Sequence, residues 1–99
     1  MIRDFFLGTI KIHILYHAGK EPVYGSYLIE ELEEHGHHVS PGTMYPTLNS
    51  LMEEGLLSRE DQLVNGKIRK YYSLTPKGRE VLEECKRQIR ELANEVLED

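Results

Sequence analysis

The stretch LLSREDQLVNGKIRKYYSLTP, residues 56–76, holds two strand-like runs on either side of Asn65-Gly66. An Asn-Gly pair between such runs is the strongest short signal for a β-hairpin, because both central turn residues need positive φ. A two-residue loop also fixes the register of the two strands. The expected cross-strand pairs are Leu63–Ile68, Asp61–Lys70, Arg59–Tyr72 and Leu57–Leu74. The opposite charges of Asp61 and Lys70 support this register.

The preceding segment, VSPGTMYPTLNSLMEEG at residues 39–55, predicts an amphipathic helix with Met44, Leu48 and Leu51 as its inward stripe. Ser40 can cap this helix, and Pro41 suits the first helical position, where its missing N–H costs nothing. Gly42 and Pro46 are one turn apart and share the face opposite the stripe. An alternative is that they mark a turn and that the helix begins near Tyr45.

The outer face of this helix is flat, polar and poor in large side chains at its amino end. Free N–H groups at a helix amino terminus bind phosphate readily, and glycine allows close backbone approach. We therefore expect this end to enter a groove of DNA. The candidate contacts are Ser40, Thr43, Tyr45, Thr47, Asn49 and Ser50. Asn49 has the chemistry to read adenine bidentately, although an exposed Asn is more often only solvated.

After the hairpin, Thr75-Pro76 predicts the start of a last helix over about 76–98. Its apolar residues recur at spacings of 3, 4, 3 and 4, as in a coiled-coil seam. The first helix, residues 4–18, carries Leu7, Ile10 and Ile14 on one face, with Phe5, Ile12 and Tyr16 off it, so it needs cover on more than one side. If these helices paired between two chains, the apolar seam of the last helix and the second apolar side of the first helix would both be covered. The expected dimer-interface residues are Leu7, Ile14, Leu82, Cys85, Ile89, Leu92 and Val96. The alternative is a last helix packed on its own domain.

With a second helix over about 24–35, the order is helix, helix, helix, long hairpin, helix. This order indicates a mostly α chain with a β-hairpin wing, a winged helix-turn-helix in which the third helix enters the major groove. We expect residues 1–75 to form the DNA-binding domain and residues 76–99 a dimerisation helix in the same compact unit. Lys67, Arg69 and Lys70 on the wing suit the minor groove or phosphates. The alternative is an edge hairpin kept soluble by its charges.

The charge distribution gives a weak electrostatic hint of the same kind. The net charge is −5, yet residues 41–79 hold six basic and four acidic groups, whereas the segments on both sides are acidic. No apolar run is long enough to span a membrane, and the amino terminus lacks the pattern of a secretory signal. A single cysteine, Cys85, agrees with a reducing compartment. We expect a cytoplasmic protein.

The sequence resembles the PadR family of winged-helix transcriptional regulators in its short, single-domain form. The resemblance rests on SPGTMYPTL at 40–48 and RKYYSLTPKGRE at 69–80, together with LGTIKIHIL at 7–15, PVYG at 22–25 and EEGLL at 53–57. It implies a homodimer whose last helix packs against the partner's first helix, binding of a double-stranded DNA operator, and usually repression. It also adds Tyr24 as a candidate DNA contact.

Two departures limit what the resemblance implies. Many members carry a basic residue where this chain has Asn49 and Ser50, so the operator sequence does not carry over. Some members bind flat aromatic compounds, often against a tryptophan, and this chain has none. A small-molecule effector is therefore unknown.

Other functions lack a comparable pattern. There is no phosphate-binding glycine loop, nucleophile elbow or HExxH pair, so we expect no enzyme and no catalytic residues. His13 and His17, and the group His35, His37 and His38, suggest a metal-responsive repressor as an alternative. They lack a matching cysteine or carboxylate pattern, so we predict no metal and no cofactor. Cys85 serves most simply as a small apolar residue, and an interprotomer disulfide is the rarer alternative. A winged-helix module that binds protein is the remaining alternative.

Overall fold

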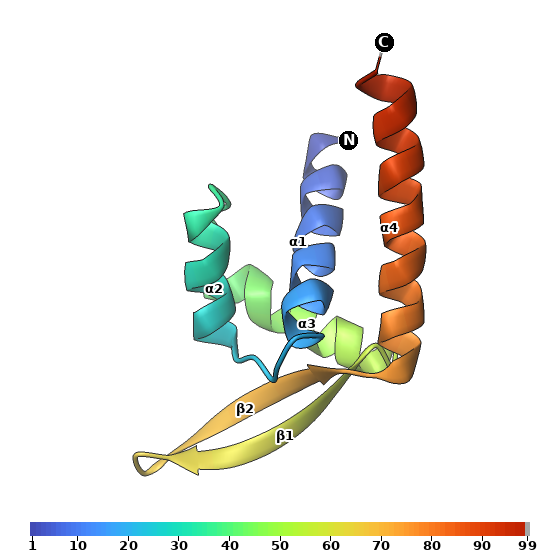
Figure 1. Ribbon diagram of the computed structural model, residues 1–99. Helices are drawn as coiled ribbons and strands as arrows, with labels where there is room; N and C mark the ends of the chain where they lie inside the picture. The colour runs from blue at the N-terminus through green and yellow to red at the C-terminus, as the bar shows by residue number, and fades with distance from the viewer. Residues whose placement is uncertain (99) are drawn as a thin grey trace.

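Four helices and one β-hairpin follow one another in the order expected for a winged helix-turn-helix (Figure 1). The computed structural model describes residues 1–98. The elements are α1 (Ile2–Ala18), α2 (Gly25–Glu34), α3 (Pro41–Glu53), β1 (Leu57–Val64), β2 (Lys67–Leu74) and α4 (Pro76–Val96). The expected fold class is confirmed. Among residues 1–98, no helix is both long and apolar enough to cross a membrane.

The hairpin has the register that its turn predicts. Leu57 pairs with Leu74, Arg59 with Tyr72, Asp61 with Lys70 and Leu63 with Ile68. Asn65 and Gly66 have φ values of 50° and 77°, as a two-residue turn with two positive φ angles requires. The carboxylate of Asp61 forms its ion pair along its own strand, with Arg59 at 3.0 Å. The predicted register is therefore confirmed. The ion pair of Asp61, however, is with Arg59 and not with Lys70 as the sequence suggests.

The core lies where α1, α2 and α3 meet the base of the wing. Met44, Leu48 and Leu51 are buried, which confirms the inward stripe of α3. Tyr72 of β2 is buried as well, and its backbone N–H and C=O both bond to Val23, with N–O distances of 2.7 and 2.9 Å. This bridge fixes the base of the wing to the segment that precedes α2.

The first turn of α4 packs tightly against the junction between α3 and β1 and is hydrogen-bonded to it. The hydroxyl of Thr75 accepts the N–H of Gly78 at 3.0 Å, the cap expected from the sequence, and donates to the carbonyl of Gly55 at 2.6 Å. A Cβ added at Gly78 would lie 2.2 Å from the carbonyl oxygen of Leu56, so only glycine fits there. From this joint, α4 runs beside α1 in the opposite direction (Figure 1).

Two residues expected at the dimer interface, Ile14 and Leu82, are also part of the core of the chain. Ile14 is 0% exposed and Leu82 is 3% exposed, so most of each side chain packs within the chain, although Leu82 also lines the apolar groove described below. The reason is that α1 is covered by its own chain on the face that carries Ile14, and the start of α4 contributes to that cover. Leu7 is half-buried.

The sequence leaves open whether α3 begins at Pro41 or near Tyr45, and the structure shows the earlier start. The helix begins at Pro41, with Ser40 at the N-cap position, and not near Tyr45. The hydroxyl of Ser40 makes no capping bond to the backbone and lies 3.4 Å from the hydroxyl oxygen of Thr43. The α1 helix begins two residues before the expected position, at Ile2.

Candidate nucleic-acid interface

The face of α3 that points away from the core is exposed and carries little side-chain bulk. Pro41, Gly42, Tyr45, Pro46 and Asn49 are exposed along it. Of the six positions expected to contact DNA, Ser40, Tyr45 and Asn49 are exposed, and Thr43, Thr47 and Ser50 are half-buried. Such a surface lets another backbone approach the helix closely.

The two half-buried threonines already take part in hydrogen bonds within α3 or with its N-cap residue. The hydroxyl of Thr47 donates to the backbone carbonyl of Thr43 at 2.7 Å. Ser40 donates to the hydroxyl of Thr43 at 3.4 Å, a long bond that a ligand can displace. Asn49 is exposed, so its amide is a polar group on this face that is open to a ligand.

Tyr45 is held in place by Gly25, the first residue of α2. Tyr45 is 43% exposed as a residue, yet a Cβ added at Gly25 would lie only 2.5 Å from Cε1 of its ring. Gly25 itself is buried. The ring of Tyr45 therefore rests on the backbone of α2, a contact that sequence reasoning did not identify.

The wing is tied to the same end of α2 through Tyr24. The guanidinium carbon of Arg69 lies 4.2 Å from the centre of the Tyr24 ring, and the rings of Tyr24 and Tyr71 meet edge to face at 5.6 Å. Arg69 is half-buried, whereas Lys67 and Lys70 are exposed. Of these three basic residues of β2, one is thus fixed in position and two are free to reach outward.

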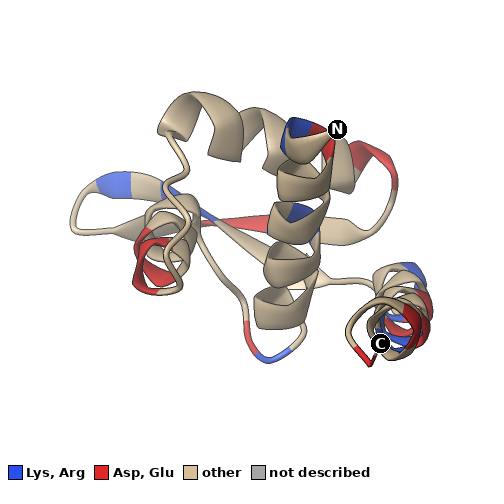
Figure 2. Cartoon of the chain, turned by 90° about the horizontal axis from the view of Figure 1, so that it is seen from above, with Lys and Arg blue, Asp and Glu red and all other residues tan. Residues whose placement is uncertain are grey.

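These parts enclose a cleft of about 530 Å³ between the wing tip and the amino ends of α2 and α3. Its lining residues are Tyr24, Gly25, Ser26, Tyr45, Val64, Asn65, Lys67, Ile68, Arg69 and Lys70. Figure 2 shows basic residues at the far end of the wing, acidic residues on α2, and both kinds on α4. Glu53 and Glu54 lie at the carboxyl end of α3, away from this cleft. The cleft therefore brings one expected contact of the helix, Tyr45, beside the basic wing residues Lys67, Arg69 and Lys70. The other five expected positions of the helix do not line it.

A second, apolar surface lies between α1 and α4. This groove has a volume of about 700 Å³ and is lined, among others, by Phe5, Ile12 and Tyr16 from α1, by Leu82, Ile89, Leu92 and Val96 from α4, and by Leu97 directly after α4. Ile89, Leu92 and Val96 are about half exposed. The α1 residues in the groove are those that fall off its core face in the sequence, and they were not named as interface candidates. Cys85 is half-buried and is not one of the groove residues.

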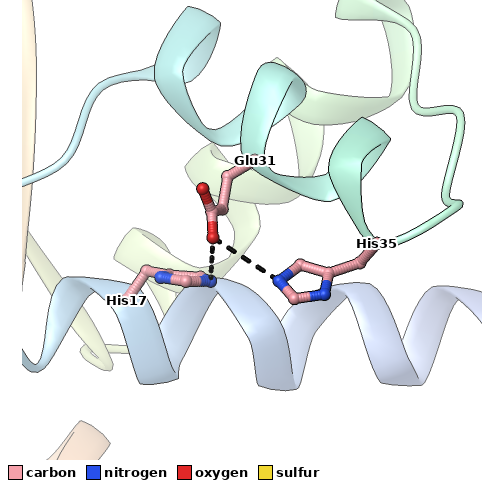
Figure 3. Close-up of polar contacts among 3 residues, drawn as sticks. All are labelled: His17, Glu31 and His35. Atoms are coloured by element: carbon pink, nitrogen blue, oxygen red, sulfur yellow. Dashed lines mark ion pairs between the residues drawn. The ribbon is translucent and has the colours of Figure 1, made fainter.

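Histidines of α1 and of the segment that follows α2 gather at one side of this groove. The carboxylate of Glu31 on α2 lies 3.9 Å from Nε2 of His17 on α1 and 3.4 Å from Nε2 of His35 at the end of α2 (Figure 3). The His13 ring lies 5.6 Å from the His35 ring and 5.3 Å from the His37 ring. Burial, together with the neighbouring histidines, lowers the pKa of His13, and burial lowers that of His17. The sequence showed the histidines but not Glu31, which reaches His17 only when α2 packs on α1.

Comparison with known proteins places the chain among transcriptional regulators. The model of the transcriptional regulator PadR-like family matches residues 14–84. Transcriptional regulator Rv3488 of Mycobacterium tuberculosis is 47% identical over 96 residues, which cover 97% of this chain and 90% of that protein. Transcriptional regulator YqjI of Escherichia coli is 35% identical over 91 residues, but these make up only 42% of its length.

Solved structures agree with this placement. A PadR-like transcription factor from Bacteroides fragilis superposes with a TM-score of 0.85 at 36% identity, covering 97% of this chain and 94% of that one. A PadR family transcriptional regulator from Eggerthella lenta gives a TM-score of 0.87 at 34% identity, covering 99% and 87% of the two chains.

Proposed function

Because the chain belongs to the PadR-like family of transcriptional regulators, we propose that it is a repressor that binds an inverted-repeat DNA operator as a homodimer. The observation that carries the proposal is the continuity of one surface. Tyr45 of α3, whose ring rests on Gly25, and Arg69 of the wing, which stacks on Tyr24, line the same cleft. A groove-reading helix and a phosphate-binding wing need such a fixed relative position.

In this proposal, α3 supplies the contacts that distinguish sequences. The exposed Asn49 amide suits the N6 and N7 atoms of adenine in the major groove. Ser40, Thr43 and the N–H of Gly42 at the start of α3 suit a phosphate at the groove edge, whereas the N–H groups of Thr43 and Met44 already donate to the carbonyl of Ser40. Glycine and proline on the outer face keep bulky side chains from holding the helix away from the bases.

The wing supplies contacts that do not depend on sequence. Lys67 and Lys70 are exposed at the tip and suit phosphates or the adjacent minor groove. Arg69 keeps the wing at a fixed angle to α2 through Tyr24 while its charge still adds to the basic side of the cleft. The acidic groups on α2 and α4 lie elsewhere on the chain (Figure 2).

The homodimer is supported by the groove between α1 and α4. Ile89 and Leu92 are 48% and 50% exposed and face Phe5 and Tyr16 across the groove. An apolar surface of this kind marks an interaction site in a water-soluble domain. A second copy offers the same pair of helices, so a two-fold arrangement buries both grooves at once. A dimer held in this way presents two copies of α3 to two half-sites.

The compartment and the mode of regulation follow from this proposal. A DNA-binding regulator acts where the chromosome is, which in a bacterial cell is the cytoplasm. A dimer occupying an operator within a promoter would exclude the transcription machinery, which is the simplest form of repression.

The experiment that tests DNA binding is the salt dependence of affinity. Each phosphate contact releases counterions, so the logarithm of the association constant should fall linearly with the logarithm of salt concentration. The double variant Lys67→Ala Lys70→Ala removes four contacts per dimer and should make that slope about 3 to 4 less steep. The variant Arg87→Ala Arg90→Ala, which makes the same charge change on the exposed surface of α4, is the matched control and should keep the wild-type slope. Association with no duplex, or with a slope near zero, would instead favour a protein-binding winged helix.

A further inference from the structure

Two imidazoles and one carboxylate converge on a single point where the carboxyl end of α2 packs against α1. Nε2 of His17 and Nε2 of His35 both face the same oxygen, Oε1 of Glu31, from different directions (Figure 3). The three ligand atoms all lie within 4.8 Å of one another. This cluster lies away from the cleft that serves DNA binding in the proposal above.

The separations suit one small ion between the three atoms. Zinc binds imidazole nitrogen and carboxylate oxygen at about 2.0–2.2 Å in tetrahedral sites, which places neighbouring ligand atoms about 3.3 Å apart. The Glu31–His35 separation is 3.4 Å and the Glu31–His17 separation is 3.9 Å. The Glu31–His35 separation therefore already has the required length, and the Glu31–His17 separation is about half an ångström too long. The third separation, between the two histidines, is within 4.8 Å, and a movement of the His17 ring toward the other two ligands would shorten both.

We propose that His17, Glu31 and His35 form a binding site for one divalent transition-metal ion of the zinc type, with a fourth coordination position left open. Two neutral nitrogens and one carboxylate are the ligand types that suit Zn²⁺, Co²⁺ and Ni²⁺, whereas Ca²⁺ and Mg²⁺ prefer sites made of oxygen alone. The carboxylate also offsets one of the two positive charges of the ion.

The surroundings of the site determine what the ion would do. His17 is nearly buried and Glu31 is half-buried, so both ligands are held by the packing of α1 against α2. His35 is about half exposed and belongs, with His17, to the wall of the apolar groove. The ion would cross-link α1 to the end of α2, and its open position would face the groove.

The first test is metal binding by the full chain without a histidine tag. Zn²⁺ is titrated in competition with a chromophoric chelator, and Co²⁺ is followed by its visible absorption, which is strong for four-coordinate sites. The proposal predicts one ion per chain. Glu31→Gln and His35→Gln should each weaken Zn²⁺ binding at least tenfold and lose the intense Co²⁺ bands. His38→Gln is the matched control, because His38 is an exposed histidine that pairs with Glu33 at 3.2 Å outside the cluster, and it should bind as the wild type does.

The second test is thermal unfolding of the same proteins. Because an ion that binds only the folded chain stabilises it, Zn²⁺ should raise the midpoint of the wild type and of His38→Gln by several degrees. It should leave the midpoints of Glu31→Gln and His35→Gln unchanged. His35 is at the surface, so its variant remains informative if Glu31→Gln fails to fold. Wild-type affinity in both cluster variants, an equal loss in His38→Gln, or no binding at micromolar Zn²⁺ would overturn the proposal. None of these outcomes depends on DNA binding.

Discussion

The guanidinium carbon of Arg69 lies 4.2 Å above the centre of the Tyr24 ring, so a basic residue of the wing is stacked on the residue that precedes α2. A cation–π contact at an exposed position contributes about 0.5–1 kcal/mol. Tyr24→Leu should therefore weaken binding to duplex DNA about two- to fivefold per protomer by loosening the wing. Tyr24→Phe keeps the ring and should bind within twofold of the wild type in a fluorescence anisotropy titration. Equal losses in the two variants would show that the hydroxyl, not the stacked ring, matters.

The contact between Tyr45 and Gly25 predicts a coupling that a double-mutant cycle can measure. A Cβ at position 25 would lie 2.5 Å from Cε1 of Tyr45, and overpacking of this kind costs about 1–3 kcal/mol. Gly25→Ala should lower the free energy of unfolding by that amount in the wild type and by much less in a Tyr45→Ala background. Urea unfolding of the four proteins gives the result. Additive effects would mean that the ring moves aside freely.

Asn49 and Lys70 should differ in what they contribute to binding. Lys70→Ala removes a phosphate contact and should weaken operator and random duplexes by the same factor. Asn49→Ala should weaken the operator by about 1–3 kcal/mol and leave random DNA nearly unchanged, because a bidentate contact reads one base. Affinities of both variants for both duplexes check this division. A uniform effect of Asn49→Ala would assign that residue to positioning.

A charge in the middle of the groove should separate the protomers. Leu92 is 50% exposed on the groove side of α4, and Leu92→Glu would place a carboxylate in the apolar interface of the proposed dimer. We expect monomers by light scattering coupled to size exclusion. Gln88→Glu, which makes the same change at an exposed α4 position outside the groove, should remain dimeric. A dimeric Leu92→Glu protein would show that the groove is not the interface.

The histidine cluster predicts a loss of stability in mild acid. The pKa of His13 is lowered, first by burial and then by the charges of His37, His35 and His17, so the unfolded chain binds the proton more readily than the folded one. Stability should thus be full above the ordinary value of 6.5 and should decrease as the pH falls below it. His13→Gln should show a shallower fall in thermal midpoint between pH 7 and pH 5, measured with a chelator present. Parallel curves for the two proteins would contradict this.

The sequence predicts the elements of the fold best where short-range chemistry determines them. The Asn65-Gly66 turn fixes the whole hairpin register, and Thr75 with Pro76 fixes the start of α4. The stripe of Met44, Leu48 and Leu51 gives the inner face of α3 without knowledge of its neighbours. Each of these signals depends on residues within one or two turns of the chain.

The remaining features depend on how separate helices pack together. Glu31 meets His17, and Tyr45 meets Gly25, only through contacts between different helices. Some apolar residues of α1 lie in the core and others line the groove, and the periodicity of the sequence does not show which apolar face of α1 belongs to which. For this reason periodicity predicts Ile14 at an interface, whereas in the structure Ile14 is buried and Phe5 and Tyr16 line the groove.

Selection of bound duplexes from a random pool tests the central proposal most directly. The untagged chain is incubated with random-sequence DNA at moderate salt, and the bound fraction is amplified and sequenced over several rounds. A dimer with two copies of α3 should recover an inverted repeat with two equal half-sites at a constant spacing. Recovery of no enriched sequence, or of a single asymmetric site, would contradict a symmetric regulator that reads DNA with this helix.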